Sequence, residues 1–74
     1  MEFWILDVYY QHGSMASQQQ VRDALQSLKE ESLQVVDNHG YPCIRFPRSR
    51  GWKQFEKFTR ELESLGFETD FEGS

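Results

Sequence analysis

The stretch from residue 3 to residue 10, Phe-Trp-Ile-Leu-Asp-Val-Tyr-Tyr, constrains the fold more than any other part of the chain. It is rich in β-branched and aromatic residues and holds no glycine or proline, which predicts a β-strand. Both faces are mostly apolar, so we expect a central strand with further strands on each side. The two faces hold Trp4, Leu6, Val8 and Tyr10, and Phe3, Ile5, Asp7 and Tyr9.

A helix and a β-hairpin follow this strand. Ser17 and Gln20 match the capping box, which predicts that a helix begins there. Strands are expected at residues 33–36 and 41–46, joined by a turn at residues 37–40. Because Pro42 has no N–H to donate, regular pairing of the second of these strands is expected from Cys43 onward. The apolar stripe of the helix consists of Val21, Ala24, Leu25 and Leu28.

A second helix and a last strand complete the pattern. Pro47 ends the preceding strand, and Ser49 is the predicted N-cap of the helix. Gly66 is the predicted stop of the helix, and residues 67–72 alternate between polar and apolar as a half-buried edge strand does. The residues expected to face the core share one arc of the helix: Trp52, Phe55, Phe58, Leu62 and Leu65.

The order β-α-β-β-α-β predicts an α+β fold of the ferredoxin-like, split β-α-β type, a four-stranded antiparallel sheet with two helices on one face. The 74 residues are expected to form one small domain, residues 1–74. Two alternatives stay open. Gly-Ser-Met at residues 13–15 resembles a cloning junction, which would make residues 1–14 an appended segment. The last strand could also exchange between two chains.

Composition argues against several kinds of site. The single cysteine, Cys43, rules out an intramolecular disulfide, and we expect it to be a small apolar filler. His12 and His39 give no zinc-ligand spacing and have no catalytic partner at a recognisable distance, so we expect no metal, no cofactor and no enzyme. The acidic start and short apolar run predict neither a signal peptide nor a membrane span, and a cytoplasmic location is expected.

Positive charge is concentrated in residues 45–60, which carry net +5, whereas the rest of the chain carries net −9. A localised basic surface on an acidic chain favours an anionic partner at that place. The alternative interpretation is a solvated helix face, because Glu56 with Arg60 and Lys57 with Glu61 have favourable i,i+4 spacing. The residues predicted to bind a partner are Arg45, Arg48, Arg50, Lys53, Lys57 and Arg60.

The sheet face opposite the helices is predicted to be open. Its alternation pattern places four apolar or aromatic residues there, Phe3, Ile5, Tyr9 and Tyr41, as a surface for a homodimer or a partner. The layout resembles the RNA-recognition motif, whose central strands stack bases on aromatic rings. The basic-Gly-aromatic pattern of that family is not present, since Gly40-Tyr41 continues into Pro42-Cys43. No functional residue is therefore carried over from it.

Three classes of function follow, in order of preference. The first is a non-enzymatic binding or adaptor module that binds an anionic macromolecular partner through residues 45–60. The expected partner is a protein, and the alternative is a nucleic acid. The second is a small acidic regulator or inhibitor, of the kind that mobile elements encode, which occupies a basic site on a host protein. The third, a nuclease with Asp7 as metal ligand, lacks a companion acid in the sequence pattern.

Overall fold

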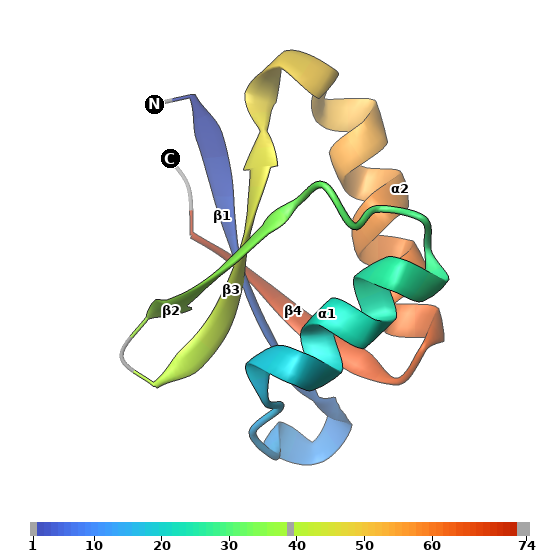
Figure 1. Cartoon of the computed structure of the whole chain (residues 1–74). Coiled ribbons are helices and arrows are strands. Elements are labelled where there is room, and N and C mark those ends of the chain that lie inside the picture. The colour runs from blue at the N-terminus through green and yellow to red at the C-terminus, as the bar shows by residue number, and fades with distance from the viewer. Residues whose placement is uncertain (1, 39, 73–74) are drawn as a thin grey trace.

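A computed structural model describes residues 2–38 and 40–72 and shows a four-stranded antiparallel sheet with two helices on one face (Figure 1). The strand order is β2-β3-β1-β4, so β1 and β3 are central, as predicted. The predicted ferredoxin-like, split β-α-β fold is confirmed. The elements are β1 (Phe3–Tyr10), α1 (Gln18–Ser27), β2 (Gln34–Asn38), β3 (Tyr41–Pro47), α2 (Trp52–Ser64) and β4 (Phe67–Glu72), with 3₁₀ turns η1 (Gln11–Gly13) and η2 (Arg48–Arg50).

The register of β1 fixes which side chains share a face of the sheet. Leu6 lies opposite Ile44 of β3 and Phe71 of β4, and these three face the helices. Asp7 lies opposite Cys43 and Asp70, and these belong to the other face. Directly opposed residues on neighbouring strands point to the same side of the sheet. The two faces predicted for residues 3–10 therefore extend over β3 and β4.

The core lies between the sheet and the two helices. Phe46 of β3 packs against Phe55 and Phe58 of α2, with ring centroids 5.3 Å apart in both pairs. Trp4 shares a face of β1 with Leu6, and Leu28 belongs to the apolar stripe of α1, but both are half-buried and pack against the margin of the core. The fully buried side chains come from β1, β3 and both helices: Leu6, Val8, Val21, Leu25, Pro42, Cys43, Ile44, Phe46 and Leu62.

The helix ends test the predicted caps. Ser17 Oγ accepts a hydrogen bond from the Gln20 N–H at 3.1 Å, and the Ser17 N–H donates to Gln20 Oε1 at 2.9 Å, so the capping box of α1 is confirmed. The predicted cap of α2 is wrong. Ser49 lies within η2, and Gly51, at φ 91°, is the N-cap residue and offers no side chain. Glycine suits this position because a positive φ strains residues with a side chain. Gly66, at φ 97°, follows α2 as predicted.

Three further details differ from the predictions. Strand β2 begins one residue later and ends two residues later than expected. Pairing of β3 begins at Tyr41 and includes Pro42 opposite Asp37, because a proline can keep its place in the register although it donates no hydrogen bond. Trp52 and Leu65, expected in the core, are 48% and 45% exposed. They lie at the two ends of the α2 stripe, and burial is confined to Phe55, Phe58 and Leu62.

Within the described part of the chain, neither helix is long and apolar enough to cross a membrane.

Candidate interaction surfaces

The six basic residues of residues 45–60 lie in three different environments. Arg45 is on β3 and faces the open side of the sheet, because it lies opposite Ile5. Arg48 and Arg50 belong to η2. Lys53, Lys57 and Arg60 are exposed on α2, on the side opposite the buried phenylalanines. The stretch that is continuous in sequence is therefore divided between both sides of the sheet and one end of it.

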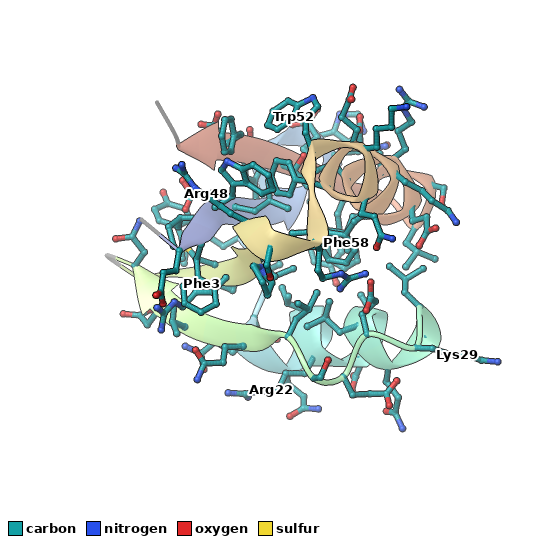
Figure 2. The ribbon with its side chains drawn as sticks, turned by 90° about the horizontal axis from the view of Figure 1, so that it is seen from above. Phe3, Arg22, Lys29, Arg48, Trp52 and Phe58 are labelled. Atoms are coloured by element: carbon teal, nitrogen blue, oxygen red, sulfur yellow. The ribbon has the colours of Figure 1, made fainter. Side chains whose placement is uncertain are left out.

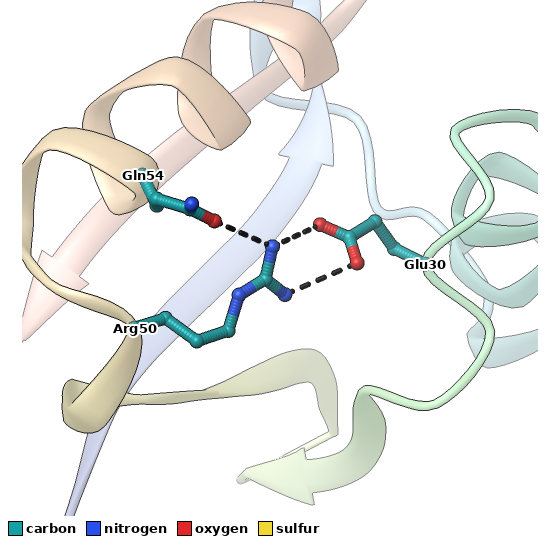
Figure 3. A network of polar contacts seen from close by, with 3 residues as sticks. All are labelled: Glu30, Arg50 and Gln54. Carbon is teal, nitrogen blue, oxygen red and sulfur yellow. Dashed lines mark hydrogen bonds and ion pairs between the residues drawn. The ribbon is translucent and has the colours of Figure 1, made fainter.

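Arg50 is engaged within the fold. Its guanidinium donates to both carboxylate oxygens of Glu30, at 3.1 and 2.8 Å, and to Gln54 Oε1 at 3.0 Å (Figure 3). The same group lies 4.6 Å from the ring centroid of Phe46. The bidentate contact joins the loop after α1 to η2, and the bond to Gln54 continues it to the first turn of α2. The contact with Glu30 neutralises one of the six predicted binding charges.

Arg45 and Arg48 rest on aromatic rings. The Arg45 guanidinium lies 4.2 Å from the Phe3 ring centroid and donates to Gln34 Oε1 at 3.0 Å. The Arg48 guanidinium lies 5.5 Å from the Trp4 ring, and its buried Nε has no hydrogen-bond partner among the described residues. Both arginines are half-buried. Such cation–π contacts hold the side chains over the rings and leave part of each guanidinium at the surface.

Trp52 extends the aromatic core to the surface near η2. Its ring contacts the rings of Trp4, Phe55 and Phe71 at centroid distances of 5.5, 5.4 and 5.5 Å. In the view of Figure 2, Arg48 lies between Trp52 and Phe3 at this end of the molecule. Tryptophan and arginine are enriched where proteins meet partners, so this end is suited to contact as well as to packing.

A groove of about 370 Å³ runs between α2 and the loop that follows α1. We call it the helix groove. Leu28 and Phe58 supply its apolar lining, and Lys53 and Lys57 lie on its α2 side. Neither lysine forms an ion pair within residues 2–38 and 40–72, whereas Arg60 reaches Glu56 at 3.8 Å. The remaining lining residues are Glu30, Arg50, Gln54 and Glu61.

The open side of the sheet carries more acid than the sequence analysis predicted. The register places Glu68 opposite Tyr9 and Asp70 opposite Asp7, so three carboxylates share this side with the predicted aromatics. The alternation within residues 67–72 predicts that the acidic residues share one face of the strand. Only the pairing of β4 with β1 shows which residues of β1 lie beside them. We call this surface the acidic sheet face: Phe3, Ile5, Asp7, Tyr9, Tyr41, Glu68 and Asp70.

The electrostatics of the acidic sheet face are visible at Tyr9. Desolvation raises the pKa of the Tyr9 phenol above its ordinary value, and the carboxylates of Asp70, Glu68 and Asp7 raise it further. An anionic phenolate is disfavoured beside negative charge, so the contribution of the carboxylates, which adds to that of desolvation, reflects a negative potential on this side of the sheet. The basic residue Arg45 lies on the same side, held by Phe3 and Gln34.

The remaining candidate residues of the sequence are Cys43, His12 and His39. The Cys43 thiol is buried and donates to Asp7 Oδ1 at 2.7 Å, so it lies beneath the acidic sheet face. No group of three or more metal-ligating side chains occurs within residues 2–38 and 40–72. His12 is exposed in η1, and His39 lies outside the described residues.

No family model, curated protein or solved structure matches this chain.

Proposed function

We propose that the protein is a non-enzymatic binding module that holds an anionic macromolecular partner, an acidic segment of another protein, in the helix groove. The observation that carries the proposal is the pair Lys53 and Lys57. Both are exposed, both line the groove, and neither has an ion-pair partner in the described part of the chain. Beside them, the half-buried Leu28 offers apolar contact, and the buried ring of Phe58 forms the floor of the groove.

The spacing of the two lysines does not stabilise α2, and the ion pair that i,i+4 spacing allows between Lys57 and Glu61 is not formed within the described residues. The two lysines are like charges at i,i+4 spacing, an arrangement that destabilises a helix by roughly 0.2–0.5 kcal/mol. A partner that brings carboxylates would remove this repulsion and add attraction. An amphipathic acidic segment fits best, because it could place apolar side chains on Leu28 and carboxylates on the lysines.

Charge favours a protein partner over a nucleic acid. Glu61 lines the groove together with the lysines, and the chain as a whole carries net −4. A continuous phosphate backbone could not avoid these carboxylates, whereas a peptide can place its acids at chosen positions. Arg48 and Trp52, at the end of the sheet, would extend the contact for a longer partner.

A synthetic amphipathic peptide built of leucine and glutamate tests the proposal. Titration calorimetry should show binding to the wild-type protein, and Lys53→Glu with Lys57→Glu should weaken it by about tenfold or more. The matched control is Arg22→Glu with Lys29→Glu, which makes the same charge change at exposed residues that do not line the groove. Equal losses in the two double variants would show unspecific attraction and overturn the proposal.

A pull-down from a lysate of the source cells, with and without nuclease, separates the two kinds of partner. A protein retained after nuclease treatment by the wild type and the control, and lost with the Lys53 and Lys57 reversals, supports the proposal. A partner that disappears with nuclease points to nucleic acid and contradicts it. Its affinity would also fall steeply with salt, because each neutralised phosphate releases counterions.

A further inference from the structure

The side of the sheet opposite the helices is a surface that the proposed function does not use. Both helices lie on the other side (Figure 1). No described element covers Phe3, Ile5 and Tyr9, which are half-buried by their neighbours, and Tyr41 is 46% exposed. A contiguous apolar and aromatic patch of this kind marks an interaction site on a small protein.

The arrangement of the carboxylates on this patch lowers the stability of the fold. Asp7 and Asp70 lie directly opposite each other on β1 and β4, and like charges in such a pair destabilise a sheet. Asp7, Glu68 and Asp70 form no ion pair within the described residues. After desolvation, the same three carboxylates contribute to the raised pKa of Tyr9.

We infer that the acidic sheet face is a second docking surface, and that it takes a cationic, amphipathic segment of another protein. The surface offers carboxylates for lysine or arginine side chains and aromatic rings for their cation–π contacts and apolar neighbours. Arg45 is an example of such a cation–π contact within the chain, because its guanidinium lies over the Phe3 ring on this side. The inference does not rest on the helix groove, which lies on the other side of the sheet.

Charge complementarity favours a cationic protein segment at this surface over a second copy of the chain or a nucleic acid. A second copy of the chain would bring the same surface, with three described carboxylates against Arg45, and two such faces would repel each other. A nucleic acid would place phosphates beside Asp7, Glu68 and Asp70. Only a positively charged partner relieves the repulsion between the opposed aspartates and covers the aromatic rings in the same contact.

The test uses a synthetic amphipathic peptide built of leucine and lysine, titrated into isotope-labelled protein. We expect the largest amide shifts in β1, β3 and β4. Glu68→Lys with Asp70→Lys should weaken binding by about tenfold or more. The matched control is Glu31→Lys with Glu63→Lys, two exposed acids that lie off this face, and it should bind within about twofold of the wild type.

The outcomes are distinct. Equal weakening by both double variants, shifts spread over both helices, or no binding by the wild type would overturn the inference. A dimer mass in light scattering without peptide, lost in Glu68→Lys with Asp70→Lys, would show that a second copy occupies the face and would also overturn the inference.

If the lysine variants fail to fold, Glu68→Gln with Asp70→Asn removes the charges with little change of shape. Lys53→Glu with Lys57→Glu should retain this binding, so failure here and failure of the proposed function are separable.

Discussion

Phe55 is the residue on which the aromatic packing depends most. It is 2% exposed, and its ring contacts the rings of Trp4, Phe46, Trp52 and Phe71 at 5.0–5.4 Å. Phe55→Ala should lower the free energy of unfolding by about 3–5 kcal/mol through lost burial and a cavity. Leu65→Ala, at a 45% exposed position on the same helix, should cost less than about 0.5 kcal/mol in the same urea titration. Similar costs at the two positions would contradict this assignment of the core.

Arg50 should matter for folding more than any other base of residues 45–60. Arg50→Lys loses the bidentate contact with Glu30 and the stacking on Phe46, and we expect a cost of about 1–2 kcal/mol at this partly exposed site. Arg60→Lys changes an exposed pair at 3.8 Å and should cost almost nothing. Thermal unfolding of the two variants side by side gives the comparison, and an unaffected Arg50→Lys protein would show that the contact is not structural.

Tyr9 provides a measurement of the acidic sheet face that needs no partner. The folded protein holds the phenol proton more tightly than the unfolded chain, since burial and the three carboxylates raise the pKa of Tyr9. This stabilisation is complete below the unfolded pKa of about 10 and is lost as pH rises through the raised folded value. Glu68→Gln with Asp70→Asn should lower the Tyr9 pKa, followed by the chemical shift of its ring carbon. An unchanged titration midpoint would exclude those carboxylates as a cause.

Single residues also show where sequence reasoning succeeds and where it stops. Ser17 was predictable as a cap because its partner, Gln20, is three residues away and the pattern is local. The role of Arg50 was not, because its partner Glu30 is twenty residues distant and only the folded chain brings them together. Trp52 was assigned to the core because periodicity gives the direction of a side chain but not the point at which cover by neighbouring elements ends.

The two helices differ at their N-termini in whether a side chain caps them. Ser17 caps α1 with its side chain, whereas Ser49 lies in η2 and no side chain caps α2. Ser17→Ala should therefore cost about 1 kcal/mol, and Ser49→Ala should stay within about 0.5 kcal/mol of the wild type. Chemical denaturation of both variants tests this. A larger loss from Ser49→Ala would mean that the sequence-based assignment of the cap was nearer the truth.

Elements were predicted well where hydrophobic periodicity is strong. The bounds of β1 and β4 and the fold order followed from alternation and from two amphipathic stripes, since these patterns decide which face is buried. The candidate surfaces followed only in part. Residues 45–60 contain the positive charge, but they span a strand, a 3₁₀ turn and a helix that present it in three directions. The acidic sheet face depends on the pairing of β1 with β4, and no local pattern contains that register.

At the level of the whole molecule, the two proposed docking surfaces lie on opposite sides of the sheet and carry opposite charge. The molecule measures 30 × 25 × 20 Å along its principal axes, so even its shortest dimension exceeds the Debye length of ~8 Å at physiological salt. The surfaces should therefore act independently. Lys53→Glu with Lys57→Glu should leave the affinity for the leucine–lysine peptide within about twofold, because distant sites contribute nearly additively.

The reciprocal experiment completes this prediction. Glu68→Lys with Asp70→Lys should leave the affinity for the leucine–glutamate peptide within about twofold at physiological salt. At low salt the Debye length reaches ~30 Å, and the reversals should then affect the distant surface as well, strengthening acidic-peptide binding in the lysine variant. Calorimetry at the two ionic strengths measures both effects. A strong crossed effect at physiological salt would mean that the two peptides share one surface, and the picture of a module with two faces would then be wrong.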